Sequence, residues 1–325
     1  MTEFILELER VSKEFPVRGM GPRVHTLRAV DDVSLAVRHG ETLGIVGESG
    51  CGKTTLGRLV LRLIESTGGI IRFRGDDISR FSRREMKTFR SHVQMVFQDP
   101  YSSLNPRMRV GEIIGEPLEN MRIPRTETRR RVGETMELVG LSPAAAKRFP
   151  HAFSGGQRQR IGIARALAVR PSVLVCDEAV SALDVSVQAQ ILNLLHTIQK
   201  RISLTILFIS HSLGVIRFLS DHIAVMYLGR IVEHAAENAL FSAPQHPYTR
   251  ALISAVPEPH PALRGQRQIL SGDMPNPMDP PPGCVFHPRC PIARERCARE
   301  PPQLRTQAPG HTAACHYPGI QHVEE

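Results

Sequence analysis

One stretch of eight residues constrains the fold of this chain more than any other. Residues 47–54 read Gly-Glu-Ser-Gly-Cys-Gly-Lys-Thr, which matches the phosphate-loop pattern G-x-x-x-x-G-K-[ST]. An apolar run, residues 43–46, precedes the loop, and a helix-compatible run, residues 56–64, follows it. Glycines let the backbone wrap closely around phosphate, so that N–H groups and a helix N-terminus face the negative charge. The chain is therefore predicted to bind nucleotide between a buried strand and a helix.

The apolar runs of the remaining chain predict an α/β fold. Candidate buried strands are residues 42–46, 93–97, 173–176, 205–209 and 223–226, and they alternate with longer amphipathic segments. This pattern is typical of an α/β domain built on a largely parallel sheet. Between about residues 99 and 168 the strand signal fades, which predicts an inserted α-helical subdomain.

Composition divides the chain into two parts. Of the 25 prolines, 14 fall between residues 256 and 325, as do four of the six cysteines. We therefore expect a nucleotide-binding domain at residues 1–255 and a Cys/Pro-rich C-terminal extension at residues 256–325. No apolar run approaches the roughly 20 residues needed to cross a bilayer. The acidic, alternating start differs from a secretory signal, so a cytoplasmic location is expected. A net charge of +9 suits nucleic acid, anionic lipid or nucleotide phosphates equally.

A second motif contains two acidic residues of the kind that nucleotide hydrolysis requires. Residues 172–178 form an apolar strand that ends in Asp177 and Glu178. Ligands of open α/β folds bind at the carboxyl edge of the sheet, which is where these acids are expected. Lys53 is expected to reach the β- and γ-phosphates, while Thr54 and Asp177 hold Mg²⁺ and Glu178 polarises the attacking water.

A third motif predicts another surface for phosphate. Ser154, Gly155 and Gly156 form a small-residue turn, and Gln157 begins a helix-compatible run, residues 157–169. This turn lies about 20 residues before the acid pair, and residues 153–160 as a whole resemble the signature of ATP-binding cassette (ABC) ATPases. The resemblance implies a P-loop NTPase (RecA-like) core with a mixed sheet. It also implies that the signature faces the γ-phosphate on an opposite ATPase subunit, so that two nucleotides are sandwiched between two subunits.

Further markers of the same family follow in order. Gln98 resembles the glutamine that senses Mg²⁺ and the attacking water, residues 181–184 resemble the D-loop that contacts the partner subunit, and His211 resembles the switch histidine that contacts the γ-phosphate. Phe15 resembles the aromatic residue that stacks on adenine, although a single aromatic residue suits a core position equally. Catalysis is assigned to Glu178, His211 and Gln98, the last also as a Mg²⁺ ligand. The residues expected to bind ATP are Phe15, Gly47, Glu48, Ser49, Gly50, Cys51, Gly52, Lys53, Thr54, Thr55, Ser154, Gly155, Gly156, Gln157 and Asp177.

Three segments resemble the oligopeptide/dipeptide (and nickel) importer branch of ABC ATPases. They are residues 98–106, 226–230 and 246–249. This resemblance implies an ATPase on the cytoplasmic side of the cell membrane. Its partners are a second ABC ATPase subunit, identical or homologous, two membrane permeases and an extracytoplasmic binding protein. Peptides are the expected cargo, with nickel or another small solute as alternatives. A soluble ABC ATPase that contacts nucleic acid is disfavoured, because such proteins usually carry two cassettes or a long coiled-coil insertion.

The C-terminal cysteines form a separate candidate site. Their spacing is Cys284-x5-Cys290-x6-Cys297-x17-Cys315, which is looser than a zinc ribbon. Disulfides are disfavoured in a cytosolic chain. Four thiolates suit Zn²⁺ or a [4Fe–4S] cluster, and four unliganded thiols are a further alternative. Members of the resembled branch carry a cluster here, which favours iron–sulfur over zinc.

Overall fold

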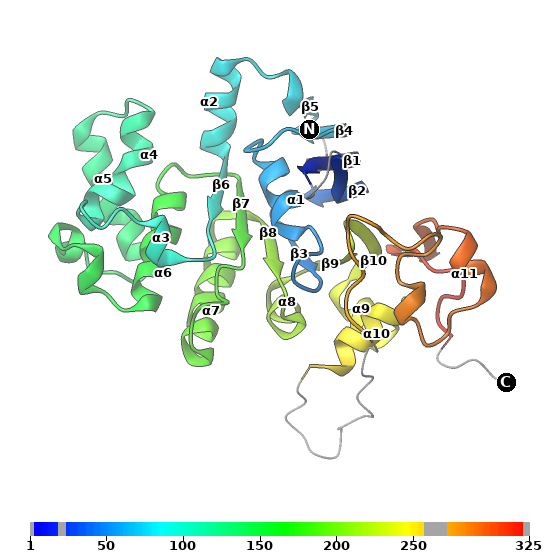
Figure 1. Cartoon of the computed structure of the whole chain (residues 1–325). Helices are drawn as coiled ribbons and strands as arrows, with labels where there is room; N and C mark the ends of the chain where they lie inside the picture. Colours follow the sequence, from blue (N-terminus) through cyan, green and yellow to red (C-terminus); the bar gives the residue numbers. More distant parts are fainter. Residues whose placement is uncertain (1–2, 19–23, 257–271, 321–325) are drawn as a thin grey trace. The chain divides into compact units, whose positions relative to one another are not determined.

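A computed structural model describes residues 3–18, 24–256 and 272–320 of the chain (Figure 1). The chain divides into two units. The first unit contains residues 38–42 and 80–210, and the second contains residues 2–37, 43–79 and 211–325. Each unit has its own strands and helices, and the motifs described above are distributed between them.

The first unit contains three parallel strands. They lie in the order β8 (Thr205–Ser210), β7 (Val173–Asp177), β6 (Val93–Val96), with Val173 paired to Thr205 on one side and to Val93 on the other. Every residue of β7 and β8 is buried, which explains their continuous apolar sequences. The helices α2 (Arg83–His92) and α7 (Val185–Ile202) belong to the same unit.

The region predicted to be helical contains four α-helices. They are α3 (Pro100–Ser103), α4 (Val110–Asn120), α5 (Arg125–Leu138) and α6 (Gly155–Leu167), joined by the 3-10 turns η2 (Pro143–Lys147) and η3 (Pro150–Ala152). Helix α4 packs against both α5 and α6, and the three lie together in Figure 1. Apolar side chains on one face of α4, among them Ile113, Ile114 and Leu118, are almost fully buried by this packing.

The second unit contains two sheets. One is mixed, because β3 (Thr42–Val46) runs parallel to β9 (His222–Tyr227), whereas β9 pairs antiparallel with β10 (Arg230–Ala236). It continues through β12 (His311–Ala313) to β11 (Arg305–Ala308). The other sheet has the order β2 (Val24–Arg38), β1 (Phe4–Arg18), β4 (Gly68–Phe73), β5 (Asp76–Asp77). The helical segments among the described residues of this unit are α1 (Lys53–Val60), α8 (Leu213–Leu219), α9 (Glu237–Ser242), α10 (Pro247–Ser254), η5 (His287–Arg289) and α11 (Glu295–Arg299), and the turn η1 (Ile78–Arg80) ends at the first residue of the other unit's long segment.

A buried carboxylate ties the C-terminal region to this unit. Glu233 on β10 is fully buried and accepts hydrogen bonds from the backbone N–H groups of Gln245 and His246, at 2.7 and 2.8 Å. The ring of His311 on β12 donates to the same carboxylate, with 2.7 Å between Nε2 and Oε1. A buried carboxylate is tolerated only when its oxygens are satisfied in this way, so Glu233 and the C-terminal strand stabilise one another.

All five predicted strands are present, and their ends differ from the prediction by at most one residue. The helix after the phosphate loop is shorter than predicted, because Arg62 adopts a left-handed backbone with φ 47° two residues after α1 ends. Helix α6 begins at Gly155 rather than at Gln157, since Ser154 caps it. The sheet of β1, β2, β4 and β5 was not predicted. Within the described ranges, no helix is long and apolar enough to cross a membrane.

Candidate functional site

The phosphate loop takes a shape that only glycine permits at two positions. A Cβ atom at Gly47 would lie 2.1 Å from the backbone oxygen of Met226, and one at Gly52 would lie 2.0 Å from that of Ala29. Gly52 also has φ 106°, in the left-handed region. The loop is therefore held against the neighbouring strands by its own backbone, and the strand-loop-helix placement predicted from the sequence is confirmed.

The lysine of the motif lies inside the loop. Lys53 is the first residue of α1 and only 4% of its surface is exposed. Its ammonium donates to the backbone oxygens of Gly47 and Glu48, at 2.7 and 2.9 Å. The positive charge is thus fixed beside the N-terminus of a helix, an arrangement that favours bound phosphate.

The two cysteines within the nucleotide motifs are packed in the interior. Cys51 in the loop is 1% exposed, and Cys176 on β7 is fully buried. Burial raises the pKa of the Cys51 thiol, although the nearby Lys53 ammonium opposes this effect. Burial also raises the pKa of Cys176. Both thiols are therefore poor nucleophiles at neutral pH.

In the first unit, the fold brings two predicted catalytic residues together. Gln98 and Glu178 are 80 residues apart in the sequence, yet Gln98 Nε2 donates to Glu178 Oε2 at 2.9 Å. They meet because each follows one of the paired parallel strands β6 and β7. Glu178 has φ 47°, which is uncommon for a residue with a side chain and typical of functional turns. Asp177, the last residue of β7, is 94% buried.

The signature turn forms a capped helix start, also in the first unit. Ser154 Oγ accepts from the Gln157 backbone N–H at 3.3 Å, while Gln157 Oε1 accepts from the Ser154 N–H at 3.1 Å. This reciprocal capping box fixes the N-terminus of the 13-residue helix α6. A Cβ atom at Gly156 would lie 2.4 Å from Cγ1 of Val187 on α7, so this glycine packs closely against the next helix.

Other predicted site residues belong to the second unit. His211 is exposed and directly follows the last residue of β8. Phe15 lies on β1, is half-buried, and has the Lys13 ammonium 5.0 Å from the centre of its ring. Thr54 and Thr55 are in the first turn of α1 and half-buried. The roles predicted for these residues stay predictions.

The four C-terminal cysteines are neighbours but do not form a prearranged metal site. Burial, with a smaller contribution from the charges on the other thiols, raises the pKa of Cys284 to about 11 and that of Cys290 to about 12. The Cys284 N–H donates to the Cys297 backbone oxygen at 2.8 Å, and the Tyr317 N–H donates to Cys315 Sγ at 3.4 Å. Across the described parts of the chain, no three His, Cys, Asp or Glu side chains are arranged to hold a metal ion. The donor chemistry suits a metal, but the geometry does not support the predicted cluster.

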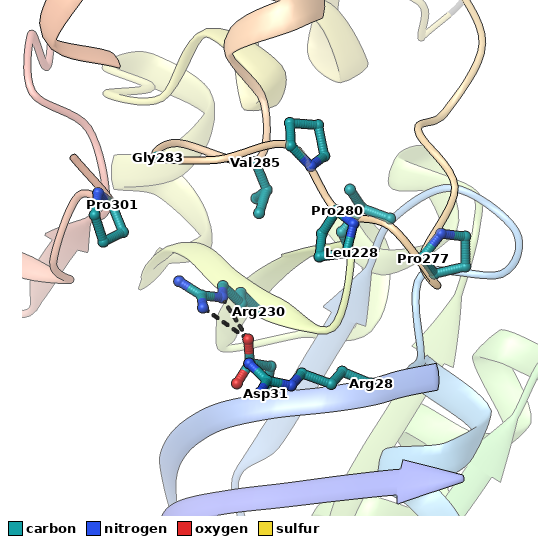
Figure 2. Close-up of a pocket in the computed structure, with 10 residues that line it drawn as sticks. Arg28, Asp31, Leu228, Arg230, Pro277, Pro280, Gly283, Val285 and Pro301 are labelled. Carbon is teal, nitrogen blue, oxygen red and sulfur yellow. Dashed lines mark hydrogen bonds and ion pairs between the residues drawn. The ribbon is translucent and has the colours of Figure 1, made fainter. Parts of the chain in front are cut away.

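One pocket lies where the C-terminal region covers the turn between β9 and β10 (Figure 2). Asp31 on β2 accepts from Arg230 at 2.8 Å from Nε and 2.7 Å from Nη2, and these two side chains face each other across its floor. The opposite wall is made of proline side chains, among them Pro277 and Pro280. Because Asp31 and Arg230 already neutralise each other and the rest of the lining is largely apolar, we interpret this pocket as a packing feature.

Tyr248 is a contact of the phosphate loop that sequence reasoning missed. Its hydroxyl accepts from the Glu48 backbone N–H at 2.9 Å, although the two residues are 200 positions apart. No local pattern predicts such a pairing. The available signal is the segment at residues 246–249, which contains Tyr248 and resembles the importer branch.

Two regions of the chain match known protein families. Residues 30–181 match the family described as ABC transporter. Residues 232–297 match the family described as oligopeptide/dipeptide transporter, C-terminal region. The first match contains the phosphate loop, the signature turn and the acid pair, and the second contains Tyr248 and three of the four C-terminal cysteines.

Similar proteins align along almost the whole chain. A putative peptide import ATP-binding protein of Brucella ovis is 51% identical over 317 residues, which cover 97% of this chain and 98% of the relative. The oligopeptide transport ATP-binding protein AppF of Bacillus subtilis is 50% identical over 321 residues, with 97% of each chain covered.

Two solved structures are also similar. One is cbiO1 of Clostridium perfringens, part of the ABC transporter complex cbiONQ, with a TM-score of 0.65, 26% identity and coverage of 74% of this chain and 92% of that one. The other is a dimeric ATP-binding cassette in a post-hydrolysis state with ADP and Pi, with a TM-score of 0.62, 27% identity and coverage of 71% and 98%.

Two glycines of the loop form a matched pair for mutation. Gly52→Ala places a methyl group against the Ala29 backbone oxygen, whereas a Cβ atom at Gly50 meets nothing within 4 Å, although Gly50 also has positive φ. We expect Gly52→Ala to raise the Kd for MgATP at least about tenfold, which corresponds to about 1.4 kcal/mol. Gly50→Ala carries only the backbone strain and should weaken binding less. Titration with a fluorescent ATP analogue measures both, and equal effects would contradict the close-contact argument.

Proposed function

Because the chain belongs to the ABC transporter ATP-binding proteins that carry the oligopeptide/dipeptide transporter C-terminal region, we propose that it hydrolyses ATP to power peptide uptake by an importer. The observation that carries this proposal is identity of 50–51% to peptide and oligopeptide import ATP-binding proteins, over 97% of the chain. The same alignments include the C-terminal region as well as the cassette, so the likeness extends beyond a generic ATPase.

Each nucleotide motif has a proposed task in hydrolysis. Lys53 and the loop amides bind the β- and γ-phosphates, and Thr54 and Asp177 hold Mg²⁺. Glu178 polarises the attacking water, and the hydrogen bond from Gln98 supports this task by orienting the Glu178 carboxylate. His211 contacts the γ-phosphate. The Gln98 to Glu178 contact is the geometric support for this assignment.

The signature turn is proposed to act on nucleotide held by a second ATPase subunit. The capped N-terminus of α6, with Gly155 and Gly156 in its first turn, offers free backbone N–H groups to an anion. ATP then joins two subunits, and loss of the γ-phosphate weakens their contact. The second subunit is identical or homologous. Closure and opening of the two subunits are passed on to two membrane permeases through the surface near Gln98 and the helical subdomain. An extracytoplasmic binding protein delivers the cargo, and the ATPase lies at the cytoplasmic face of the membrane.

Glu178→Gln tests the proposed water-polarising role. The substitution keeps the size and hydrogen-bonding capacity of the side chain but removes its basicity. We expect turnover to fall by about 10²- to 10⁴-fold while ATP binding is retained. Phosphate release in single-turnover assays measures the effect. Glu295→Gln on α11 is the matched control, because this side chain is 76% exposed and pairs with Arg299 in its own helix. Near wild-type turnover in Glu178→Gln would remove the role.

Reconstitution tests the transport function and its cargo. The ATPase is purified together with the two permeases that associate with it, placed in proteoliposomes, and supplied with the binding protein and labelled peptides. ATP-dependent peptide uptake is expected, and excess Ni²⁺ should not compete. Uptake of nickel or of another small solute in place of peptide would reassign the cargo. ATP hydrolysis without uptake of any of these solutes would contradict the importer assignment.

For the C-terminal cysteines we propose a [4Fe–4S] cluster, with Zn²⁺ as the alternative. Two features support it: four soft thiol donors lie in one region, and the Tyr317 N–H is directed at the sulfur of Cys315. Because no prearranged metal group exists among the described residues, side chains such as those of Cys284 and Cys290 must reorient on binding. Thiol protons are released when the ligands bind.

Anaerobic purification tests the cluster. We expect a broad absorption band near the blue end of the visible range and about four iron atoms per chain, as a [4Fe–4S] centre requires. Cys290→Ser should lower the iron content, whereas Cys176→Ala should not, because Cys176 is buried in β7. A colourless, zinc-loaded protein sinks the iron–sulfur assignment and leaves the alternative.

A further inference from the structure

An arginine of the C-terminal region is buried against the phosphate loop. Arg289, the last residue of η5, is 8% exposed. It forms a two-pronged ion pair with Glu48, with 2.8 Å from Nη1 to Oε2 and 3.2 Å from Nη2 to Oε1. The partners are 241 residues apart in sequence, and both belong to the second unit. Paired, parallel hydrogen bonds of this kind fix the orientation of the carboxylate as well as its charge.

Because Glu48 lies in the phosphate loop, its ion pair with Arg289 affects how the loop binds ATP. Glu48 is the second residue of the phosphate loop, and its backbone oxygen accepts from the Lys53 ammonium at 2.9 Å. An unpaired carboxylate here would repel the phosphates and compete with them for the lysine. Arg289 neutralises that carboxylate, so the loop can attract an anion while carrying an acid.

The backbone of Glu48 is held from the same side. The Tyr248 hydroxyl accepts from its N–H at 2.9 Å. Tyr248 packs edge to face on Tyr227, with 4.8 Å between ring centres, and Phe286 of the C-terminal region packs edge to face on Tyr227 at 5.2 Å. All three rings are almost fully buried, so they form a rigid support. Both the charge and the main chain of Glu48 are therefore fixed by residues outside the loop.

Arg289 is itself fixed by a tight turn. Its N–H donates to the Phe286 oxygen at 3.0 Å, the His287 N–H donates to the Cys284 oxygen at 2.9 Å, and the Cys290 N–H donates to the His287 oxygen at 3.2 Å. Successive turn bonds leave the segment few conformations. The guanidinium thus extends from an ordered support.

We infer that Arg289 is a positioning residue for ATP binding, which neutralises Glu48 and holds the phosphate loop in its binding shape. The C-terminal region then contributes to the nucleotide site without touching the nucleotide. This inference deepens the proposed ATPase function and does not depend on the cargo or on the permeases.

The test measures the Kd for MgATP of the full-length chain by calorimetric titration, and melting temperature in parallel. Arg289→Met should raise the Kd about tenfold, which corresponds to about 1.4 kcal/mol. Arg289→Lys keeps the charge but loses the two-pronged geometry, so its Kd should lie between those of the wild type and Arg289→Met. In the double variant Glu48→Gln with Arg289→Met the unpaired carboxylate is gone, and most of the lost affinity should return.

Arg294→Met is the matched control. It removes an exposed cation from the same region, where Arg294 lies over the Tyr317 ring at 4.4 Å. Its Kd should equal that of the wild type. In steady-state ATPase assays, Arg289→Met should raise KM by more than it lowers kcat, because the loss is in binding.

Three outcomes would overturn the inference. An unchanged Kd with a lowered melting temperature assigns Arg289 a purely structural role. An equal rise in Kd for Arg294→Met indicates a general effect of charge. A double variant no better than Arg289→Met shows that the Glu48 carboxylate is not the cause. If Arg289→Met does not fold, Arg289→Lys and the double variant still test the inference. A Kd of Arg289→Lys equal to that of the wild type, together with a Kd of the double variant no lower than that of Arg289→Lys, contradicts the pairing. Because binding needs no permease, this failure is distinguishable from failure of transport.

Discussion

The phosphate loop depends on close contact between backbones, and much of the second unit is arranged to provide it. Gly47 and Gly52 lie so near the oxygens of Met226 and Ala29 that a single added carbon would overlap them. Those oxygens belong to β9 and β2, so the shape of the loop is set by the packing of two sheets. The Gly229 N–H, in the turn after β9, also donates to the Cys51 oxygen at 2.9 Å. A loop fixed in this way does not need to be ordered by phosphate, which reduces the entropy cost of binding.

Two carboxylates, the fully buried Glu233 and the partly exposed Glu48, attach the C-terminal region to the same unit. Glu233 is satisfied in part by His311, and Glu48 is satisfied by Arg289. Apolar burial of Phe286 accompanies these polar contacts. For the buried pair of Glu233 and His311, removal of one partner costs about 3–5 kcal/mol, because an uncompensated charge remains. The C-terminal region therefore stabilises the unit in part by supplying partners for these two carboxylates.

Prediction from the sequence succeeded where the signal is local. The five apolar runs became strands, and the loop between residues 43–46 and α1 has the expected form, because burial and the glycine pattern act over a few residues. Contacts between distant residues could not be predicted, since nothing near Glu48 identifies Tyr248 or Arg289 as its partners. The sheet of β1, β2, β4 and β5 was missed because its strands alternate charged and apolar residues and face solvent on one side. Cysteine spacing suggested a donor set, but spacing does not determine where side chains point.

The acidic residue at position 48 of the phosphate loop depends on the C-terminal region for a neutralising positive charge. An acid at position 48 is unfavourable in a site that must attract ATP, unless a cation with fixed geometry neutralises it. Arg289 meets this requirement because its turn is closed by hydrogen bonds and its side chain is 92% buried. A lysine offers charge without the fixed fork, and a mobile surface arginine offers the fork without the burial that strengthens the pair. A cassette of this kind without its C-terminal region would therefore keep a complete phosphate-loop motif and still bind ATP less tightly, because the motif alone does not include the charge that balances Glu48.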